Sequence, residues 1–124
     1  MSTNVELDEL AATLRDYGFA YLVTVGGAGR AHVLAVTPVL GDHGFAVGGV
    51  GRHSQANATA HPDVTLVWPP AEPAGYSLLV DGTATVDGET ITVRPSKAVL
   101  HRPAPGADGQ RTGSDCVAVP LPDA

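Results

Sequence analysis

The sequence predicts a mainly β protein, an antiparallel barrel or sandwich of about six or seven strands with one N-terminal helix and a short helix after the third strand. Three observations lead to this fold class. Short segments rich in β-branched and aromatic residues follow one another, glycine- and proline-rich turns separate them, and helical periodicity is convincing only at the start. The 15 glycines and 10 prolines have no fixed period, which excludes a collagen-like chain. An antiparallel sheet of this size normally closes to protect its edges.

Length and composition fit a single domain over residues 1–124. The chain is 44% hydrophobic, which is too much for a disordered protein, and 124 residues can bury one core but not two. No apolar run approaches the roughly 18 residues of a membrane span. Glu6, Asp8 and Glu9 occupy a stretch where a signal peptide has basic and then apolar residues. We therefore expect a soluble, cytoplasmic protein.

Charge and cysteine content narrow the range of partners. The formal net charge is −6, and the seven basic residues are scattered, so we expect neither nucleic acid nor a membrane as a partner. A net negative charge does not exclude a local site for an anion. The single cysteine, Cys116, cannot form an internal disulfide, and its apolar neighbours indicate a small buried residue rather than a reactive thiol.

The N-terminal helix is expected within residues 1–17. Apolar residues recur there at helical spacing and form one stripe, made by Leu7, Leu10, Ala11 and Leu14. Thr3 and Glu6 have the spacing of a capping box at its start. Gly18 is placed to end it, because a left-handed residue after a helix is usually glycine.

The rest of the chain has the pattern of strands joined by tight turns. The Asp87-Gly88 dipeptide is the strongest hairpin signal, because a type I′ turn prefers it. Residues 69–75 form a stiff proline-rich connection, and residues 103–115 are expected to be an exposed loop. Strands are expected over residues 19–25, 30–39, 45–49, 63–68, 76–86 and 89–94, with a short last one over residues 116–119.

The segment after the third strand is the most informative for function. A glycine-rich loop, Gly49-Val50-Gly51-Arg52-His53, leads into a helix predicted over residues 54–60. Glycines such as Gly48 and Gly49 let a ligand approach the backbone, and free N–H groups at a helix start favour an anion. Arg52 adds a charge, while Ser54 and Asn57 add hydrogen-bonding groups. This pattern indicates a phosphate site; the alternative is an ordinary turn with Ser54 as the N-cap.

Several catalytic motifs are absent from the sequence. Gly49-x-Gly51-x-x-Ser54 lacks the third glycine of a dinucleotide fingerprint, and no Gly-Lys-Ser/Thr of a P-loop occurs. The five histidines are widely spaced, so no metal site is predicted, and no Gly-x-Ser-x-Gly marks a hydrolase. No catalytic residue can therefore be assigned, which favours chemistry carried by a cofactor.

The order of these segments resembles a known family. The resemblance covers roughly residues 5–102 and rests on the helix followed by five motifs in order: Tyr21–Val25, Gly29–Val33, Gly51–Asn57, His61–Leu66 and Val80–Ala84. The chain is similar to the pyridoxamine 5′-phosphate oxidase-like, FMN-binding split-barrel proteins, especially their small bacterial members. This resemblance implies a six-stranded antiparallel split barrel that forms a homodimer with its cofactor at the interface.

The resemblance also implies a function and a set of site residues. The function would be that of an oxidoreductase acting on a small molecule with FMN or the deazaflavin F420. The strand from His32 to Thr37, above all His32, Val33, Leu34 and Ala35, would lie along the isoalloxazine ring, and the partner chain would contribute Trp68 or Tyr76. The loop and helix start would hold the phosphate through Arg52, His53, Ser54 and Asn57, and Gly48 and Gly49 would also contact the cofactor.

Two departures from the family pattern bear on this function. The family often has Arg-Lys where this chain has His53 and Ser54, so one phosphate-binding charge is missing. The true oxidases carry a C-terminal Arg-x-His that the tail after Cys116 lacks, so oxidation of pyridoxamine phosphate is not expected. The alternative is a non-catalytic dimeric module for FMN, F420 or haem, with His32, His53 or His61 as haem ligands.

Overall fold

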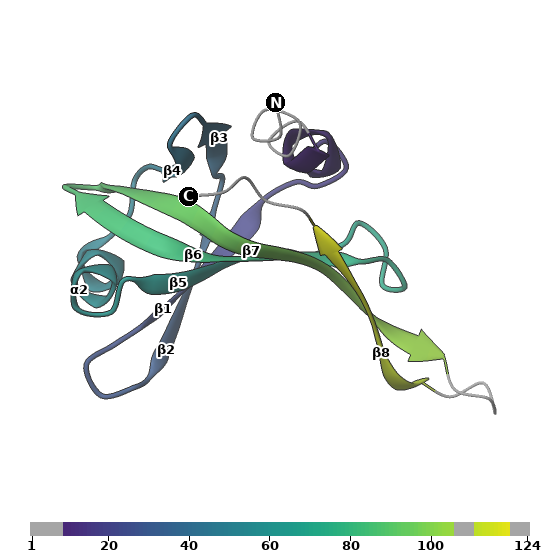
Figure 1. Ribbon diagram of the computed structural model, residues 1–124. Helices are drawn as coiled ribbons and strands as arrows, with labels where there is room; N and C mark the ends of the chain where they lie inside the picture. Colours follow the sequence, from purple (N-terminus) through teal and green to yellow (C-terminus); the bar gives the residue numbers. More distant parts are fainter. Residues whose placement is uncertain (1–8, 106–110, 120–124) are drawn as a thin grey trace.

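Eight strands form one antiparallel sheet in the computed structural model, which describes residues 9–105 and 111–119 (Figure 1). The fold class predicted from the sequence is confirmed, with eight strands in place of six. The strands are β1 (Ala20–Val25), β2 (Ala31–Val36), β3 (Val39–Gly41), β4 (Gly44–Val47), β5 (Asp63–Trp68), β6 (Ser77–Asp87), β7 (Thr90–Pro105) and β8 (Arg111–Val119).

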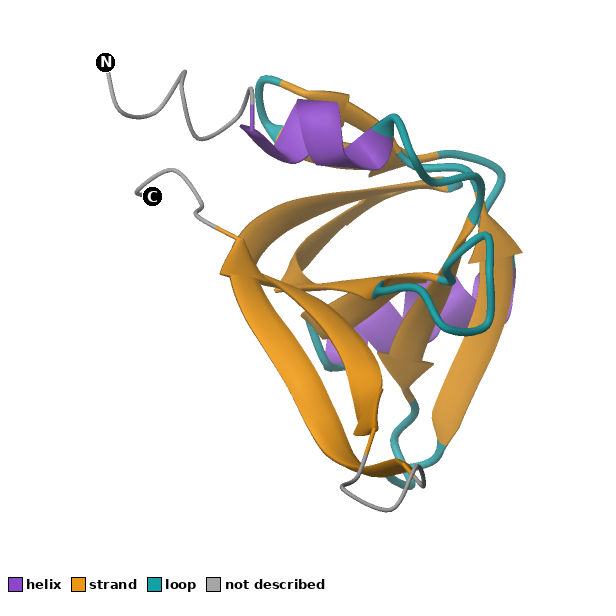
Figure 2. Cartoon of the chain, turned by 90° about the vertical axis from the view of Figure 1, so that its right-hand side faces the viewer, coloured by secondary structure: helices purple, strands orange, loops and turns teal. Residues whose placement is uncertain are grey.

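The sheet curls around a common interior without closing (Figure 2). Its strand order is β2-β1-β5-β6-β7-β4-β3, with β8 added to β7. The strands β2 and β3 stand at the two ends of this order, although they follow each other in the sequence, and no register pair joins them within the described residues. The barrel is therefore split between β2 and β3.

The second predicted strand, residues 30–39, is two strands in the structure. β2 ends at Val36, and β3 begins at Val39 on the far edge of the sheet. The break falls at Thr37-Pro38. Proline lacks the N–H that a strand interior needs, so it separates two strands that the apolar pattern alone joins.

The prediction of an exposed loop over residues 103–115 is wrong. β7 continues to Pro105, and β8 already begins at Arg111. The register pairs Arg102 with Asp115 and Pro103 with Ser114, so the proposed last strand over residues 116–119 is the end of a longer one. The register between β7 and β8 shifts between Ala104 and Pro105. Proline is tolerated at such an irregularity, so Pro105 can be the last residue of β7.

Two local predictions about turns also need correction. Residues 9–14 are helical, and the helix ends four residues before Gly18, which has no positive φ. Tyr17 N–H donates to the Leu14 carbonyl in a tight last turn.

In the β6–β7 hairpin, Asp87 pairs with Thr90, and Gly88 (φ +59°) is the first central residue. A positive φ there alone is typical of a type II′ turn rather than type I′. Thr3, Glu6 and Leu7, which were part of the predicted helix start, lie outside the described residues.

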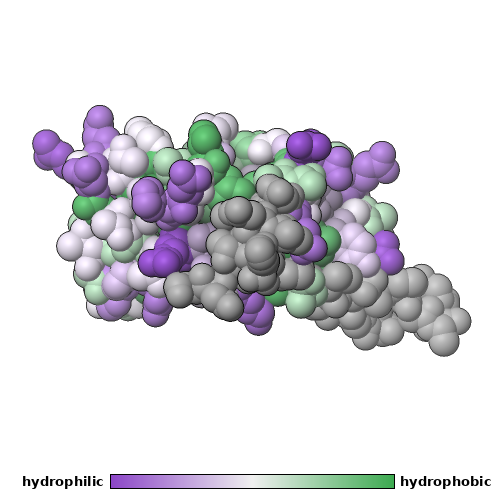
Figure 3. Space-filling model, turned by 45° about the horizontal axis from the view of Figure 1, so that its top comes forward, coloured by the Kyte–Doolittle hydropathy of each residue, from purple (hydrophilic) through white to green (hydrophobic). Residues whose placement is uncertain are grey.

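Alternate residues of the strands point inward and form the core. Phe45 packs against Trp68 with ring centroids 5.2 Å apart, and Leu10 of the N-terminal helix is fully buried in the same core cluster. On the face drawn in Figure 3, hydrophilic side chains alternate with smaller hydrophobic areas. No helix among the described residues is both long and apolar enough to cross a membrane.

The outward face of the sheet carries a second set of apolar residues, which we call the outer apolar row. Directly paired residues of antiparallel strands point to the same face, so successive register partners form a line across the sheet. This line crosses six strands through Ala35, Tyr21, Val67, Leu79, Val99 and Ala118. Tyr21 is 38% exposed, and Val33 beside the row is 56% exposed.

Candidate functional site

A depression of about 280 Å³ lies beside β2, where the barrel is split. Phe19, residues 34–37, Gly48 and Gly49 line it, and we call it the β2 slot. Four of the residues that the sequence analysis assigned to the cofactor are thereby brought together: Leu34, Ala35, Gly48 and Gly49. One wall is therefore strand and the other is the loop that follows β4.

The free edge of β2 gives the slot hydrogen-bonding capacity. Among the described residues, β2 pairs only with β1. Its other edge consequently presents backbone N–H and C=O groups without strand partners. A flat ligand with ring carbonyls and ring N–H groups could bind such an edge as a further strand would.

The loop opposite β2 leaves room for a ligand. A Cβ added at Gly48, Gly49 or Gly51 would meet nothing within 4 Å, so open space lies next to each. Gly49 also has a positive φ of 66°, which glycine adopts without strain. The loop is held in place because Val50 N–H donates to the Glu89 carbonyl and Gln55 Nε2 donates to the Val50 carbonyl.

The helix that follows, α2, spans Arg52–Ala60 and begins two residues earlier than predicted. Gly51 is its N-cap and offers no side-chain cap, so Ser54 lies inside the helix rather than at the N-cap position. The first intrahelical bond runs from Gln55 N–H to the Gly51 carbonyl, which leaves the N–H groups of residues 52–54 without helical acceptors. Such a helix start attracts anions.

Two predicted residues meet at this helix start. The rings of His32 on β2 and His53 on α2 have centroids 6.1 Å apart. Because β2 also lines the slot with Leu34 and Ala35, the strand connects the helix start with the slot.

The other predicted residues of the helix point in different directions. Arg52 lines a separate shallow depression with Gln55, Ala56 and Thr59, which share one helix face by their spacing. Ser54 is 2% exposed and therefore turned into the protein. Asn57 Nδ2 donates to Thr24 Oγ1 over 3.2 Å, which attaches α2 to β1.

The remaining candidates lie outside the slot. Trp68 is 2% exposed and packs in the core against Phe45, and Val33 is an exposed residue of the outward face. Tyr76 lines another depression, beside Asp16 and Tyr17, and the Arg102 guanidinium lies 4.5 Å from its ring centroid.

Phe19 also lines the slot and was not assigned from the sequence, whereas Val36 and Thr37 of the lining belong to the strand expected along the ring. Phe19 is 43% exposed and meets Tyr21 edge-to-face at 5.1 Å. An exposed aromatic residue directly before a strand is a weak signal of a binding surface. No group of three or more histidine, cysteine, aspartate or glutamate side chains is placed for metal binding in the part of the chain that is described.

The fold and the slot define a split-barrel protein with a depression at its open seam, and comparison with known proteins agrees with this fold. The chain is 42% identical to the uncharacterized proteins Mb0449c of Mycobacterium bovis and MT0457 of Mycobacterium tuberculosis, over 95% of this chain and 96% of theirs. It belongs to the same family as these mycobacterial proteins. No family model matches the chain.

Solved structures identify the fold. PhzG from Burkholderia lata, in complex with tetrahydrophenazine-1-carboxylic acid, aligns with a TM-score of 0.60 and 11% identity over 93% of this chain and 90% of its own. An F420 reductase aligns at 0.57 and 17% identity, over 70% and 93%. The haem storage protein HutZ from Vibrio cholerae aligns at 0.55 and 16% identity, over 72% and 89%. These proteins have the pyridoxamine 5′-phosphate oxidase-like split-barrel fold, which this chain shares.

Proposed function

We propose that this protein is a homodimeric oxidoreductase that holds FMN or F420 in the β2 slot and acts on a small molecule. The observation that carries the proposal is the continuous path along β2, from the slot at Leu34 and Ala35 to the helix start at His32 and His53. A planar ring system would lie at the slot end, and a phosphate group at the helix end. The fold shared with an F420 reductase supports this assignment.

The residues present fit such a group at both ends. At the slot, Phe19 and Leu34 supply apolar contact, while the edge of β2 supplies hydrogen bonds. At the helix start, three N–H groups and the Arg52 charge favour a phosphate, and the open space beside Gly49 and Gly51 allows close approach. A flavin or deazaflavin, when bound, supplies the hydride chemistry, and this chain's residues bind and orient it.

The proposed dimer follows from the size of the slot and from the outer apolar row. One chain encloses about 280 Å³, below the roughly 300–1,000 Å³ of typical ligand clefts. A second chain packed on the outer apolar row would cover Tyr21 and Val33, which are large exposed apolar residues. It would also complete the slot, because Ala35 belongs both to the row and to the lining.

Ligand titration tests this function directly. The purified protein is titrated with FMN and with F420 while the visible spectrum and the fluorescence of each ligand are recorded. We expect saturable binding of one of them with one ligand per chain, followed by bleaching when a reductant is added. If neither binds at high micromolar concentration, the proposal is wrong.

A second candidate is a non-catalytic module that binds haem, and one contact favours it. His32 and His53 lie close enough for one of their rings to reach an iron bound between β2 and α2. The fold is also that of a haem storage protein. Added haemin should then give a Soret band that His32→Ala or His53→Ala shifts or removes. A band that survives both changes, and also His61→Ala, would exclude these histidines as ligands.

A further inference from the structure

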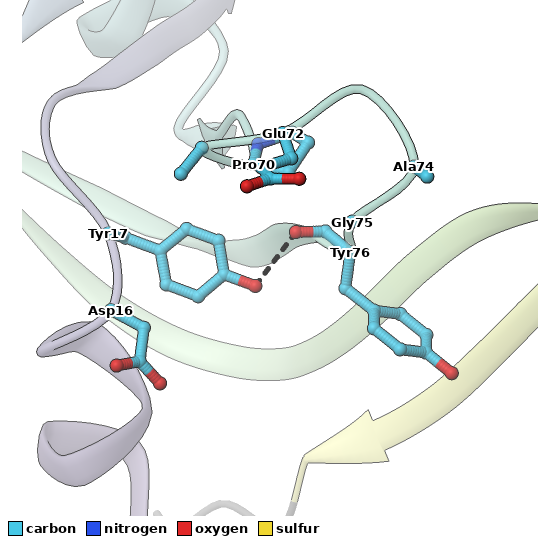
Figure 4. Close-up of a pocket in the computed structure, with 8 residues that line it drawn as sticks. Asp16, Tyr17, Pro70, Glu72, Ala74, Gly75 and Tyr76 are labelled. Atoms are coloured by element: carbon cyan, nitrogen blue, oxygen red, sulfur yellow. Dashed lines mark hydrogen bonds between the residues drawn. The ribbon is translucent and has the colours of Figure 1, made fainter.

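A second depression, of about 410 Å³, lies between the end of the N-terminal helix and the proline-rich loop after β5 (Figure 4). It is lined by Asp16 and Tyr17 on one side and by residues 70–72 and 74–76 on the other, and we call it the tyrosine pocket. It shares no lining residue with the β2 slot. Whatever it binds is therefore separate from the proposed cofactor.

The tyrosine pocket has a fixed shape. Tyr17 Oη donates to the Tyr76 carbonyl over 2.8 Å, which joins its two sides. Gly75 N–H donates to the Glu72 carbonyl, and a Cβ at Gly75 would come within 3.1 Å of Pro70 Cβ, so the loop is tightly turned. Because prolines restrict the same loop, little conformational entropy would be lost when a ligand binds.

Two carboxylates face this pocket from opposite sides. Figure 4 shows the carboxylate of Glu72 on one side of the Tyr17 ring and that of Asp16 on the other. Within the described residues, neither carboxylate has a basic partner at ion-pair distance, and no basic residue lines the pocket. Burial raises the pKa of Tyr17 above its usual value, and the nearby charge of Asp16 raises it further. The pocket therefore combines two exposed carboxylates with aromatic surface.

One aromatic ring of the lining, that of Tyr76, already contacts a cationic side chain. The Arg102 guanidinium lies 4.5 Å from the centroid of the Tyr76 ring, within the range of a cation–π contact. Arg102 does not line the pocket, so this contact leaves the carboxylates and the Tyr17 ring to act on a ligand from outside.

We propose that the tyrosine pocket binds a small organic cation, an ammonium group carried on an apolar or aromatic body. The ammonium group would pair with the carboxylate of Glu72 or of Asp16, on either side of the Tyr17 ring, and its apolar body would contact Tyr17 and Pro70. An organic cation fits better than a metal ion, because two carboxylates among aromatic and proline side chains are too few oxygen ligands for calcium or magnesium. The volume suits a ligand of this kind.

The test uses the full-length ¹⁵N-labelled protein and phenethylammonium as the probe. Its neutral analogue, 2-phenylethanol, has the same body without the charge. We expect phenethylammonium to shift the amide signals of residues 16–17 and 70–76 with an affinity that falls as salt is added. Asp16→Asn and Glu72→Gln should each weaken binding about threefold and together about tenfold, the effect expected for exposed charges.

Matched controls keep the result specific. Asp42→Asn and Glu89→Gln remove exposed carboxylates in distant turns and should leave the affinity unchanged. Equal binding of 2-phenylethanol and phenethylammonium would overturn the proposal, as would wild-type affinity in the Asp16→Asn/Glu72→Gln double variant. Signal changes confined to other residues, or none up to about 10 mM, the limit for weak ligands, would overturn it as well.

Discussion

Asn57 on α2 donates a hydrogen bond from Nδ2 to Thr24 Oγ1 on β1 over 3.2 Å, and Thr24 is completely buried. The Asn57 Oδ1 atom also lies beside Gly26, where an added Cβ would be 3.3 Å away. This contact attaches α2 to the strand next to β2 and so determines where the helix start lies relative to the slot. A residue selected from the sequence as a phosphate ligand thus has a structural contact of its own.

We expect Asn57→Ala to lower the free energy of unfolding by about 1–3 kcal/mol, because the buried Thr24 hydroxyl loses its partner. Adding Thr24→Val should recover part of this loss, since no polar group then stays unpaired. Urea denaturation of the two single variants and the double variant measures the coupling. Thr59→Ala, an exposed change on the same helix, is the control; an equal loss in both would contradict this role for Asn57.

Gly82 is expected to tolerate no side chain. A Cβ there would lie 2.5 Å from the Arg94 carbonyl oxygen and 2.7 Å from Val93 Cγ1, at the register shift after Asp81. Gly82→Ala should therefore cost about 3 kcal/mol or more of stability, since the clash is with backbone. Gly18→Ala is the matched control, because open space surrounds it and its φ is not positive. Thermal unfolding of both variants compares them; similar midpoints would refute the steric argument.

Local patterns in the sequence predict some strands well and others poorly. β5 has the predicted bounds, Asp63–Trp68, because Val64, Leu66 and Trp68 alternate with less buried residues. The far half of β7 and most of β8 lie in a stretch of glycine, proline and polar residues. Their strand form depends on pairing with each other, which is a nonlocal contact that periodicity does not reveal.

The sequence also predicted only some of the residues that form the candidate site. Leu34, Ala35, Gly48 and Gly49 meet in one slot, as their strand and loop pattern suggested. Arg52 and His53 were grouped by sequence, but adjacent residues of a helix are turned about 100° apart, so they face different sides. The place of Phe19 in the slot depends on the register of β1 against β2, which pairs Ala20 with Val36 and which the strand pattern alone does not determine.

The outer apolar row gives a test of the proposed dimer. Val33→Asp would place a charge on the exposed face beside Tyr21, where the side chain is 56% exposed and contributes little to the folded monomer. We expect this variant to sediment as a monomer at micromolar concentration, because burying an unpaired carboxylate in an interface is costly. Val39→Asp changes a residue that is 67% exposed on β3 and should leave the dimer intact. A monomeric wild-type protein would contradict the dimer itself.

Phe19 is expected to contribute to ring binding without supporting the fold. It is 43% exposed, contacts Tyr21 edge-to-face and forms one wall of the β2 slot. Phe19→Ala should weaken the binding of FMN and of riboflavin alike by about 1 kcal/mol, because both carry the same ring system. The thermal midpoint should change little. Fluorescence titration measures both affinities, and an unchanged riboflavin affinity would place the ring elsewhere.

Arg52 is expected to act on the phosphate alone. It is the first residue of α2, so its charge adds to the field of the helix start even though its side chain lies on the face with Gln55 and Thr59. Arg52→Ala should weaken FMN binding by up to about 1 kcal/mol, the range for an exposed charge that acts through space, and leave riboflavin binding unchanged.

Parallel titrations of the Arg52→Ala variant with FMN and with riboflavin distinguish two effects of Arg52. Attraction of the phosphate affects FMN alone, whereas a change in loop conformation affects both ligands. Arg94→Ala, which removes an exposed arginine from β7, is the control and should bind both ligands as the wild type does. Equal losses for the two ligands would show that Arg52 shapes the loop rather than the anion site. If the variant retained full FMN affinity, Arg52 would not bind the phosphate. The phosphate contacts would then be the N–H groups of residues 52–54 and His53, whose ring approaches His32 on β2.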